Sequence, residues 1–238
     1  MDSSYTANLA SNPNYNSDSF KYVYSSLTTP SKLYSQNFLS NKKRKVWQQK
    51  INNFQENHYE TRRINIKARD GEKIPVSLIY KKGIKLRSAP LLLYGYGSYG
   101  LIVEPSFKLS FLPLVDEGFI FAIAHIRGGQ DLGRDWYDQG RLMNKMNTFY
   151  DFIDCTKELH KKNLGSDKKT FAMGGSAGGL LMGVIINIEP ALYRGIVSVV
   201  PFVDVLTTMS DESIPLTTFE YKEWGNPSKK KEYFYIKK

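Results

Sequence analysis

Apolar and polar residues alternate in the first part of the chain. Phe20, Tyr22 and Tyr24 fall at every second position, which predicts a half-buried β-strand. Residues 32–38 and 44–50 are predicted to form further short strands. Two or three antiparallel strands of this kind are only marginally stable alone. We therefore interpret the segment as one blade, or the edge, of a larger β structure.

The pattern changes near residue 59, where longer apolar runs begin. Asp70-Gly71 between residues 60–67 and 73–80 is a strong hairpin signal. Amphipathic spacing predicts helices over residues 147–161 and 177–188. Continuous apolar runs typical of buried parallel strands occur at residues 89–94, 119–124, 171–173 and 196–200. Strands that alternate with helices predict a parallel sheet with helices on both faces.

The two patterns divide the chain into two predicted domains. Residues 1–58 are interpreted as a β segment whose first 19 residues, rich in Ser and Asn, are expected to be poorly ordered or to be the remnant of a loop. Residues 59–238 are interpreted as an α/β domain. With 41% hydrophobic residues, the chain has enough apolar side chains to form a packed core.

Composition narrows the expected partners and compartment. No apolar run approaches the length of a membrane span and no signal peptide is evident, so we expect no membrane partner. Cys155 is the only cysteine, which excludes an intrachain disulfide and favours a cytoplasmic location. The net charge is +10, but the lysines and arginines are scattered over separate segments. We therefore expect a solvated basic surface and no nucleic-acid partner.

The strongest chemical motif is Gly174-Gly175-Ser176-Ala177-Gly178-Gly179. It lies directly between a predicted strand and a predicted helix. In this context G-x-S-x-G raises a serine hydroxyl above an α/β-hydrolase sheet as a nucleophile. A phosphate-binding turn is the alternative, but the motif lacks the Lys-Ser/Thr ending of a P-loop and the spacing of a dinucleotide fingerprint. Ser176 is the candidate nucleophile.

A serine nucleophile needs an imidazole base, and the chain order in this fold is Ser, then Asp or Glu, then His. His58, His125 and His160 all precede Ser176. We expect His125 to be structural and the other two to be solvated. No aspartate or glutamate after Ser176 is identified as the acid of a triad, and Glu223 is interpreted as an ordinary surface acid.

Two glycine loops follow strands that precede the nucleophile. Gly95 to Gly100 has the spacing G-x-G-x-x-G, but Pro105 interrupts the helix that a dinucleotide site requires. The Tyr96 hydroxyl could instead stabilise an oxyanion together with the backbone N–H of Ala177. A simple glycine turn with packed tyrosines is the alternative. Arg127, in Arg-Gly-Gly, either binds substrate directly or holds its glycine turn in place.

Taken in order, several motifs closely resemble the prolyl oligopeptidase family of serine peptidases, most of all its oligopeptidase B branch. The resemblance covers residues 20–228. The motifs are Tyr94-Gly95-Tyr96-Gly97-Ser98-Tyr99-Gly100, Arg127-Gly128-Gly129 with Trp136, Gly174-Gly175-Ser176-Ala177-Gly178-Gly179, Pro201-Phe202-Val203-Asp204-Val205, Asp211-Glu212-Ser213-Ile214-Pro215-Leu216-Thr217-Thr218 and Glu223-Trp224-Gly225-Asn226-Pro227.

The resemblance implies an α/β-hydrolase peptidase domain capped by a β-propeller that admits only short peptides. It implies that Ser176 is the nucleophile and that Tyr96 and the Ala177 N–H form the oxyanion hole. It further implies cleavage after Arg or Lys, with Glu220 matching the group that recognises the basic side chain and Glu104 an acid for a second basic residue. A carboxylate suits this role because it pairs with guanidinium. We expect no cofactor and no metal.

The chain also departs from the family pattern. Lys222 and Ser106 stand where further acids are usual. Most of the propeller would precede residue 20, and the final strands with the triad Asp and His would follow residue 238. We therefore expect an incomplete α/β-hydrolase fold, preceded by the last propeller strands, with little activity and poor stability alone. A complementary C-terminal fragment is a possible partner. An esterase-type hydrolase and a non-catalytic remnant are the alternatives.

Overall fold

The structure is a computed structural model, and it describes residues 2–237. The chain divides into two compact units, each built from several segments. Among the described residues, unit 1 comprises residues 2–63, 77–84 and 104–121, and unit 2 comprises residues 64–76, 85–103 and 122–237.

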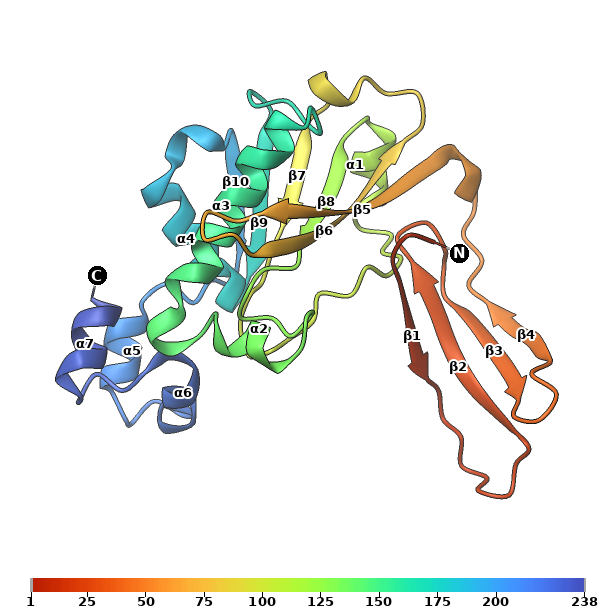
Figure 1. Cartoon of the computed structure of the whole chain (residues 1–238), viewed down its shortest axis with the longest axis horizontal. Coiled ribbons are helices and arrows are strands. Elements are labelled where there is room, and N and C mark those ends of the chain that lie inside the picture. Colours follow the sequence, from red (N-terminus) through yellow and green to blue (C-terminus); the bar gives the residue numbers. More distant parts are fainter. Residues whose placement is uncertain (1, 238) are drawn as a thin grey trace. The chain divides into compact units, whose positions relative to one another are not determined.

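Unit 1 contains a four-stranded antiparallel sheet in which neighbours in sequence are neighbours in space (Figure 1). The predicted alternation is confirmed: Tyr22 pairs with Tyr34 across two strands, and their rings stack with centroids 5.5 Å apart. Four sequential antiparallel strands are the composition of one propeller blade. The strands are β1 (Tyr5–Leu9), β2 (Ser19–Ser26), β3 (Lys32–Asn37) and β4 (Lys43–Gln48).

Strand β1 corrects the expectation that the first 19 residues are poorly ordered. Tyr5 pairs with Ser26, and the Tyr5 ring stacks on Tyr24 at 5.3 Å. Tyr5, Ala7 and Leu9 alternate with Thr6 and Asn8, a period-two strand signal that the sequence reasoning overlooked among the Ser- and Asn-rich residues around it.

The second sheet has six strands in the order β10-β9-β7-β8-β6-β5. Strand β9 runs parallel to both β7 and β10, as the apolar runs predicted. The strands β5 and β6 on either side of Asp70-Gly71 are neighbours, and the Ala68 N–H donates to Glu72 O at 2.8 Å. The strands are β5 (Tyr59–Lys67), β6 (Lys73–Lys81), β7 (Leu91–Tyr94), β8 (Ile120–Ala124), β9 (Thr170–Gly175) and β10 (Gly195–Val199).

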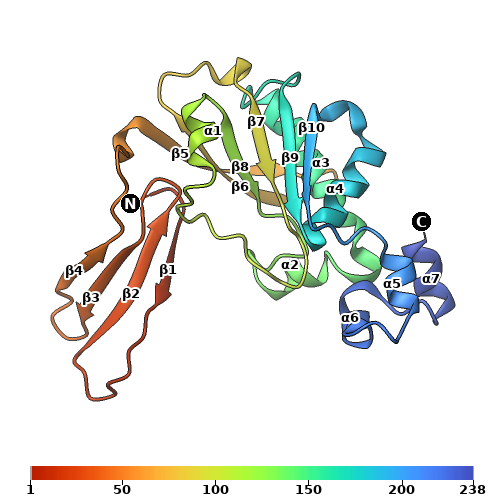
Figure 2. The ribbon, with the colours of Figure 1, turned by 180° about the vertical axis from the view of Figure 1, so that it is seen from behind.

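Helices α3 and α4 lie where the amphipathic spacing predicted them. Helix α4 packs on β9 and β10, and α3 packs on α4 (Figure 2). No helix within residues 2–237 is both long and apolar enough to cross a membrane. The α-helices are α1 (Leu112–Asp116), α2 (Arg134–Asp138), α3 (Met146–Lys161), α4 (Ala177–Ile188), α5 (Val205–Ser210), α6 (Thr217–Trp224) and α7 (Lys230–Ile236). Short 3₁₀ turns occur at Glu56–His58, Leu86–Ser88, Leu142–Asn144 and Pro190–Leu192.

The core of unit 2 lies between its strands and α3 and α4. Leu91 and Leu93 on β7, Phe152 on α3 and Leu181 on α4 have no measurable solvent exposure. A Cβ at Gly95, just after β7, would lie 2.8 Å from the Phe152 ring and 3.0 Å from Leu181. The packed core therefore fixes where the loop after β7 leaves the sheet.

Candidate active site

Ser176 occupies the sharp turn between β9 and α4. Its backbone has φ +55° and ψ −120°, which is a strained conformation for a residue with a side chain. Backbone hydrogen bonds hold it there: the Ser176 N–H donates to Val199 O at 2.9 Å, and Ser176 O accepts from the Phe202 N–H at 3.0 Å. The side chain is exposed and does not cap the helix, although serine commonly does so. The hydroxyl is thus presented to solvent at the end of the sheet.

The glycines around Ser176 are required by close backbone approach. A Cβ at Gly174 would lie 2.3 Å from Gly178 O, and one at Gly179 would lie 2.5 Å from Pro201 Cα. A Cβ at Gly178 would lie 2.9 Å from Gly95 O. These contacts are closer than real Cβ atoms approach backbone, so the turn can form only with glycine at these positions. The predicted strand–turn–helix context of the motif is confirmed.

Tyr96 and Ala177 lie beside Ser176, the candidate nucleophile. Burial raises the pKa of the Tyr96 hydroxyl, and a side-chain hydrogen bond with Ser176 opposes the rise. Tyr96 therefore stays protonated at neutral pH and can donate. Ala177 is the first residue of α4, so its N–H has no acceptor within the helix. The two donors predicted for an oxyanion hole flank Ser176.

Arg127 is a buried residue that two carboxylates hold. Its side chain is 3% exposed, and it pairs with Asp151 through Nε (2.9 Å to Oδ2) and Nη2 (2.5 Å to Oδ1). Nη1 lies 2.6 Å from Asp70 Oδ2. Because these pairs engage both ends of the guanidinium, the contacts favour the structural interpretation of Arg127 over direct substrate binding.

Three segments pack closely through their glycines: the Tyr96 loop at Gly97, the Arg-Gly-Gly turn at Gly128, and the segment around Gly140. A Cβ at Gly128 (φ +93°) would lie 2.0 Å from Gly97 O, and one at Gly140 would lie 2.0 Å from Gly128 N. The Gly100 N–H donates to Gly128 O at 3.0 Å. The Thr148 hydroxyl donates to Arg127 O at 2.8 Å. The backbone of the Arg-Gly-Gly turn thus supports the loop that carries Tyr96.

Helix α6 brings Glu220 close to the same centre. Ala177, Met209 and Trp224 form one buried apolar cluster, and Tyr96 packs against it. Glu220 lies one helical turn before Trp224, and its Oε2 accepts hydrogen bonds from the Tyr99 hydroxyl (2.8 Å) and Trp224 Nε1 (3.1 Å). The negative charge of Glu220 also contributes to the raised pKa of Tyr96. A half-buried carboxylate therefore lies within electrostatic reach of the Tyr96 hydroxyl.

Glu223 corrects an expectation, because it is 3% exposed and is not a surface acid. Its Oε1 accepts from the Tyr99 N–H at 3.0 Å, and its Oε2 accepts from the Tyr137 hydroxyl at 2.6 Å. The buried Lys145 Nζ lies 3.7 Å from Oε1. Sequence reasoning did not identify Lys145, Tyr99 or Tyr137. The only available signal was the position of Glu223 beside an apolar Trp within a family motif.

The histidines and Glu104 have other partners. His125 is 2% exposed and its Nδ1 lies 2.7 Å from Asp131 Oδ1, so the structural role predicted for it is confirmed. His160 is half-buried, with Nε2 2.7 Å from Thr170 Oγ1, so the expectation that it is simply solvated was wrong. His58 is exposed. Glu104 is an exposed residue of unit 1 whose Oε1 accepts from Asn8 Nδ2 at 3.0 Å.

The buried Lys145 gives a pH-dependent contribution to stability. Burial lowers its pKa from 10.5 to about 8, and Glu223 opposes the shift. Between those two values the unfolded chain binds more protons at this residue than the folded chain, so stability rises with pH. We expect the free energy of unfolding from urea titrations to rise more steeply from pH 8 to 10 in the wild type than in Lys145→Met. Equal slopes of the free energy of unfolding against pH would contradict a lowered pKa of Lys145. Ionisation of the tyrosines cancels in the comparison because both proteins contain the same tyrosines.

A strained serine in a glycine-rich turn between a parallel strand and a helix, with the Tyr96 hydroxyl and the Ala177 N–H beside it, is the arrangement typical of α/β serine hydrolases. The family model described as "Prolyl oligopeptidase family" matches residues 105–238. The chain belongs to the prolyl oligopeptidase family of serine peptidases, as its motifs predicted.

Relatives and solved structures agree with this assignment. The chain is 48% identical to dipeptidyl aminopeptidase BI of Pseudoxanthomonas mexicana. The match covers 99% of this chain and 33% of that protein. It matches oligopeptidase B from Trypanosoma brucei with covalently bound antipain (TM-score 0.94, 44% identity, 98% of this chain and 34% of that one). Oligopeptidase B from Leishmania major gives a TM-score of 0.95 at 41% identity, over 99% of this chain and 33% of that one. The chain thus spans about a third of the length of these relatives, and the predicted fold class is confirmed.

Proposed function

We propose that this chain provides the nucleophile, the oxyanion hole and a basic-residue pocket of a serine peptidase that cleaves short peptides after Arg or Lys. The observation that carries the proposal is Ser176, exposed at φ +55° with the Tyr96 hydroxyl beside it. Ser176 Oγ attacks the scissile carbonyl while its proton passes to an imidazole base, and an acyl-enzyme forms as the amine leaves. The Tyr96 hydroxyl and the Ala177 N–H stabilise the negative charge that develops on the carbonyl oxygen.

Preference for basic residues is supported by Glu220. Two neutral donors, the Tyr99 hydroxyl and Trp224 Nε1, orient its Oε2 and leave the net negative charge in place. The group is half-buried, so a guanidinium or ammonium that pairs with it is partly shielded from water, which strengthens the pair. We further propose, from its acidic character and the family pattern, that Glu104 interacts with a second basic residue.

We also propose that the imidazole base and its carboxylate come from a complementary chain segment. Strand β10 is the edge strand next to β9, with Val197 49% and Val199 42% exposed. Val200, just after it, is 79% exposed. An edge strand with exposed valines and unpaired backbone groups is a template for pairing with another strand. A partner strand added here would extend the sheet on the side of the nucleophile elbow.

Hydrolysis of an arginyl peptide by the purified chain tests the function. We expect little or no turnover by the chain alone, and Ser176-dependent turnover when a segment that supplies Asp and His is added. Preferential hydrolysis of simple esters over basic peptides would instead indicate an esterase. Binding of the segment without any turnover would indicate a non-catalytic remnant.

Removing the charge of Glu220 should change specificity more than the overall rate. In the complemented protein, Glu220→Gln is expected to lower kcat/KM for an arginyl substrate by roughly 10- to 100-fold, because a hydrogen bond to a charged group is lost. The value for a norleucyl substrate should change little. The matched control is Glu212→Gln, an exposed acid that accepts from the Tyr221 hydroxyl at 3.1 Å. Equal losses for both substrates would show that Glu220 does not recognise the basic side chain.

A further inference from the structure

The loop that carries the oxyanion tyrosine is held from one side by a buried lysine. Lys145, just before α3, donates from Nζ to Gly97 O at 2.6 Å and to Ser98 Oγ at 2.7 Å. Gly97 and Ser98 directly follow Tyr96, and Ser98 is fully buried. Charge-assisted hydrogen bonds inside the protein are stronger than those at the surface. Lys145 therefore fixes the backbone immediately after the oxyanion donor.

The same loop is held from another side by a buried carboxylate. Glu223 accepts from the Tyr99 N–H at 3.0 Å and from the Tyr137 hydroxyl at 2.6 Å. Its Oε1 lies 3.7 Å from Lys145 Nζ. The two opposite charges therefore bind neighbouring residues of one loop, Lys145 at Gly97 and Ser98 and Glu223 at Tyr99. Lys145 offsets part of the free-energy cost of burying the Glu223 carboxylate. Without Lys145 it would be an uncompensated buried charge.

Glu223 also belongs to the helix that carries the candidate specificity residue. Glu220 and Trp224 lie with it on α6. Tyr99 connects the two elements twice, because its backbone N–H donates to Glu223 and its hydroxyl donates to Glu220. Trp224 Nε1 donates to both the Tyr99 hydroxyl and Glu220, at 3.1 Å each. The loop and the helix are therefore connected at several points around one ion pair.

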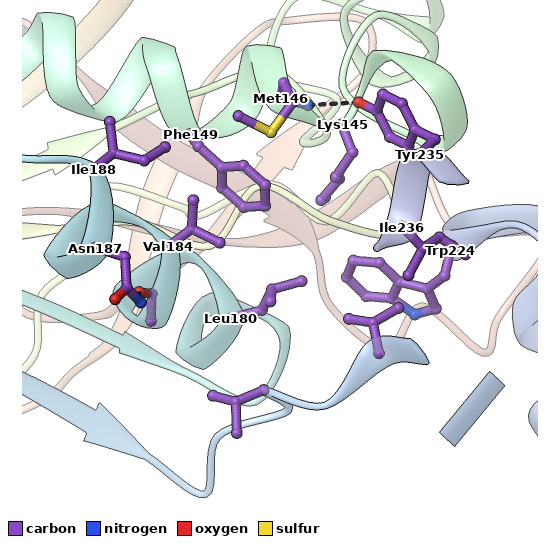
Figure 3. Close-up of a pocket in the computed structure, with 13 residues that line it drawn as sticks. Lys145, Met146, Phe149, Leu180, Val184, Asn187, Ile188, Trp224, Tyr235 and Ile236 are labelled. Atoms are coloured by element: carbon purple, nitrogen blue, oxygen red, sulfur yellow. Dashed lines mark hydrogen bonds between the residues drawn. The ribbon is translucent and has the colours of Figure 1, made fainter. Parts of the chain in front are cut away.

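The surroundings of the pair are apolar. Lys145 and Trp224 both line a pocket of about 480 Å³, whose other walls come from α3, α4, α7 and the loop after β10 (Figure 3). Lys145 Nζ lies 4.9 Å from the centre of the Trp224 ring. Lys145 is 6% and Glu223 3% exposed, so water screens their attraction less than it would at the surface. The pair is therefore suited to holding a fixed geometry.

We propose that Lys145 and Glu223 form a positioning pair that locks the oxyanion loop of Tyr96 and the acidic helix of Glu220 into one rigid unit. The pair touches neither the scissile bond nor the basic side chain. It sets the separation between the donor that meets the developing oxyanion and the carboxylate that meets the substrate cation. This proposal rests on the proposed function, since it assigns both groups to one bound peptide.

The test combines a structural signal with a binding measurement. The indole N–H of Trp224 and the amide of Tyr99 are followed by NMR in the wild-type chain, Lys145→Met and Glu223→Gln. Affinity for an N-acetylarginyl aldehyde and its norleucyl counterpart is measured for each protein complemented with the segment that supplies Asp and His. In both variants we expect the Trp224 and Tyr99 signals to shift and the Tyr99 amide to exchange at least about tenfold faster. We expect arginyl affinity to fall at least about tenfold and norleucyl affinity to fall less, because only the former uses Glu220 as well as Tyr96.

Two controls separate positioning from loss of the fold. The Trp136 indole, which donates to His125 O at 3.0 Å, reports whether the variants fold. Lys157→Met removes another lysine–carboxylate pair, with Glu189, and should change none of the signals. If Lys145→Met folds poorly, Glu223→Gln still tests the pair because it keeps the volume of the side chain. Unchanged Trp224 and Tyr99 signals in a folded variant would overturn the proposal. If the wild type binds neither aldehyde, the proposed function fails while the NMR signals still decide the positioning role.

Discussion

Addition of a segment that carries an aspartate and a histidine is expected to raise hydrolysis of an arginyl peptide at least ~10³-fold above the rate of the chain alone. The reason is the state of the nucleophile. Ser176 is exposed and strained into position, but His125 and His160 are engaged with Asp131 and Thr170. A serine hydroxyl without a base is a weak nucleophile at neutral pH. The members of a triad act together, so restoring the missing ones restores most of the rate.

Two variants show whether the gain arises at this site. Ser176→Ala should abolish the gain while it leaves binding of the segment intact. Tyr96→Phe should retain part of the gain in hydrolysis rate. It should lose about 3 kcal/mol of transition-state stabilisation, the typical effect of removing one oxyanion donor. Size-exclusion chromatography of the mixture checks that each variant still binds the segment. Ser176-dependent turnover by the chain alone would contradict the requirement for an external base.

The sequence predicted the turn that carries Ser176 and the loop that carries Tyr96, because both are built from local motifs. The glycines at 174, 178 and 179 are dictated by backbone approaches of 2.3 to 2.9 Å, so the elbow is visible in the sequence as a fixed pattern. The strands of the parallel sheet were equally visible, since strands buried on both faces read as continuous apolar runs. Tyr96 was found because it follows such a strand.

The features that the sequence did not reveal depend on contacts between distant residues. Lys145 and Glu223 are 78 positions apart, and each alone resembles an ordinary surface charge. The burial of such residues follows from the way α6 packs on the elbow, which no local period encodes. Strand β1 is a different case, because Tyr5, Ala7 and Leu9 carry a short strand alternation that was overlooked, and its pairing with β2 makes the strand evident. Arg127 was identified, but two partners from separate segments, Asp70 and Asp151, were needed to define what it contacts.

Gly128→Ala is expected to lower the free energy of unfolding by at least about 3 kcal/mol, the largest effect we predict for removal of a single glycine. Two costs combine at this position. The backbone has φ +93°, where an alanine costs about 1–2 kcal/mol. Its Cβ would also lie 2.0 Å from Gly97 O and 3.0 Å from Gly140 O. Both are backbone atoms, which cannot move aside as a flexible side chain can, and overpacking of this kind costs about 1–3 kcal/mol or more.

Gly133→Ala separates these two costs. Gly133 has nearly the same backbone angle, φ +95°, but nothing lies within 4 Å of the position of its Cβ. It should therefore lose only the conformational part, about 1–3 kcal/mol, when both variants are compared by urea unfolding. If the two variants lose the same free energy of unfolding, the close backbone packing of the three glycine loops around Gly128 adds no constraint on the substitution. A larger loss in Gly128→Ala, with a changed Tyr99 amide signal, would link this packing to the loop that carries Tyr96.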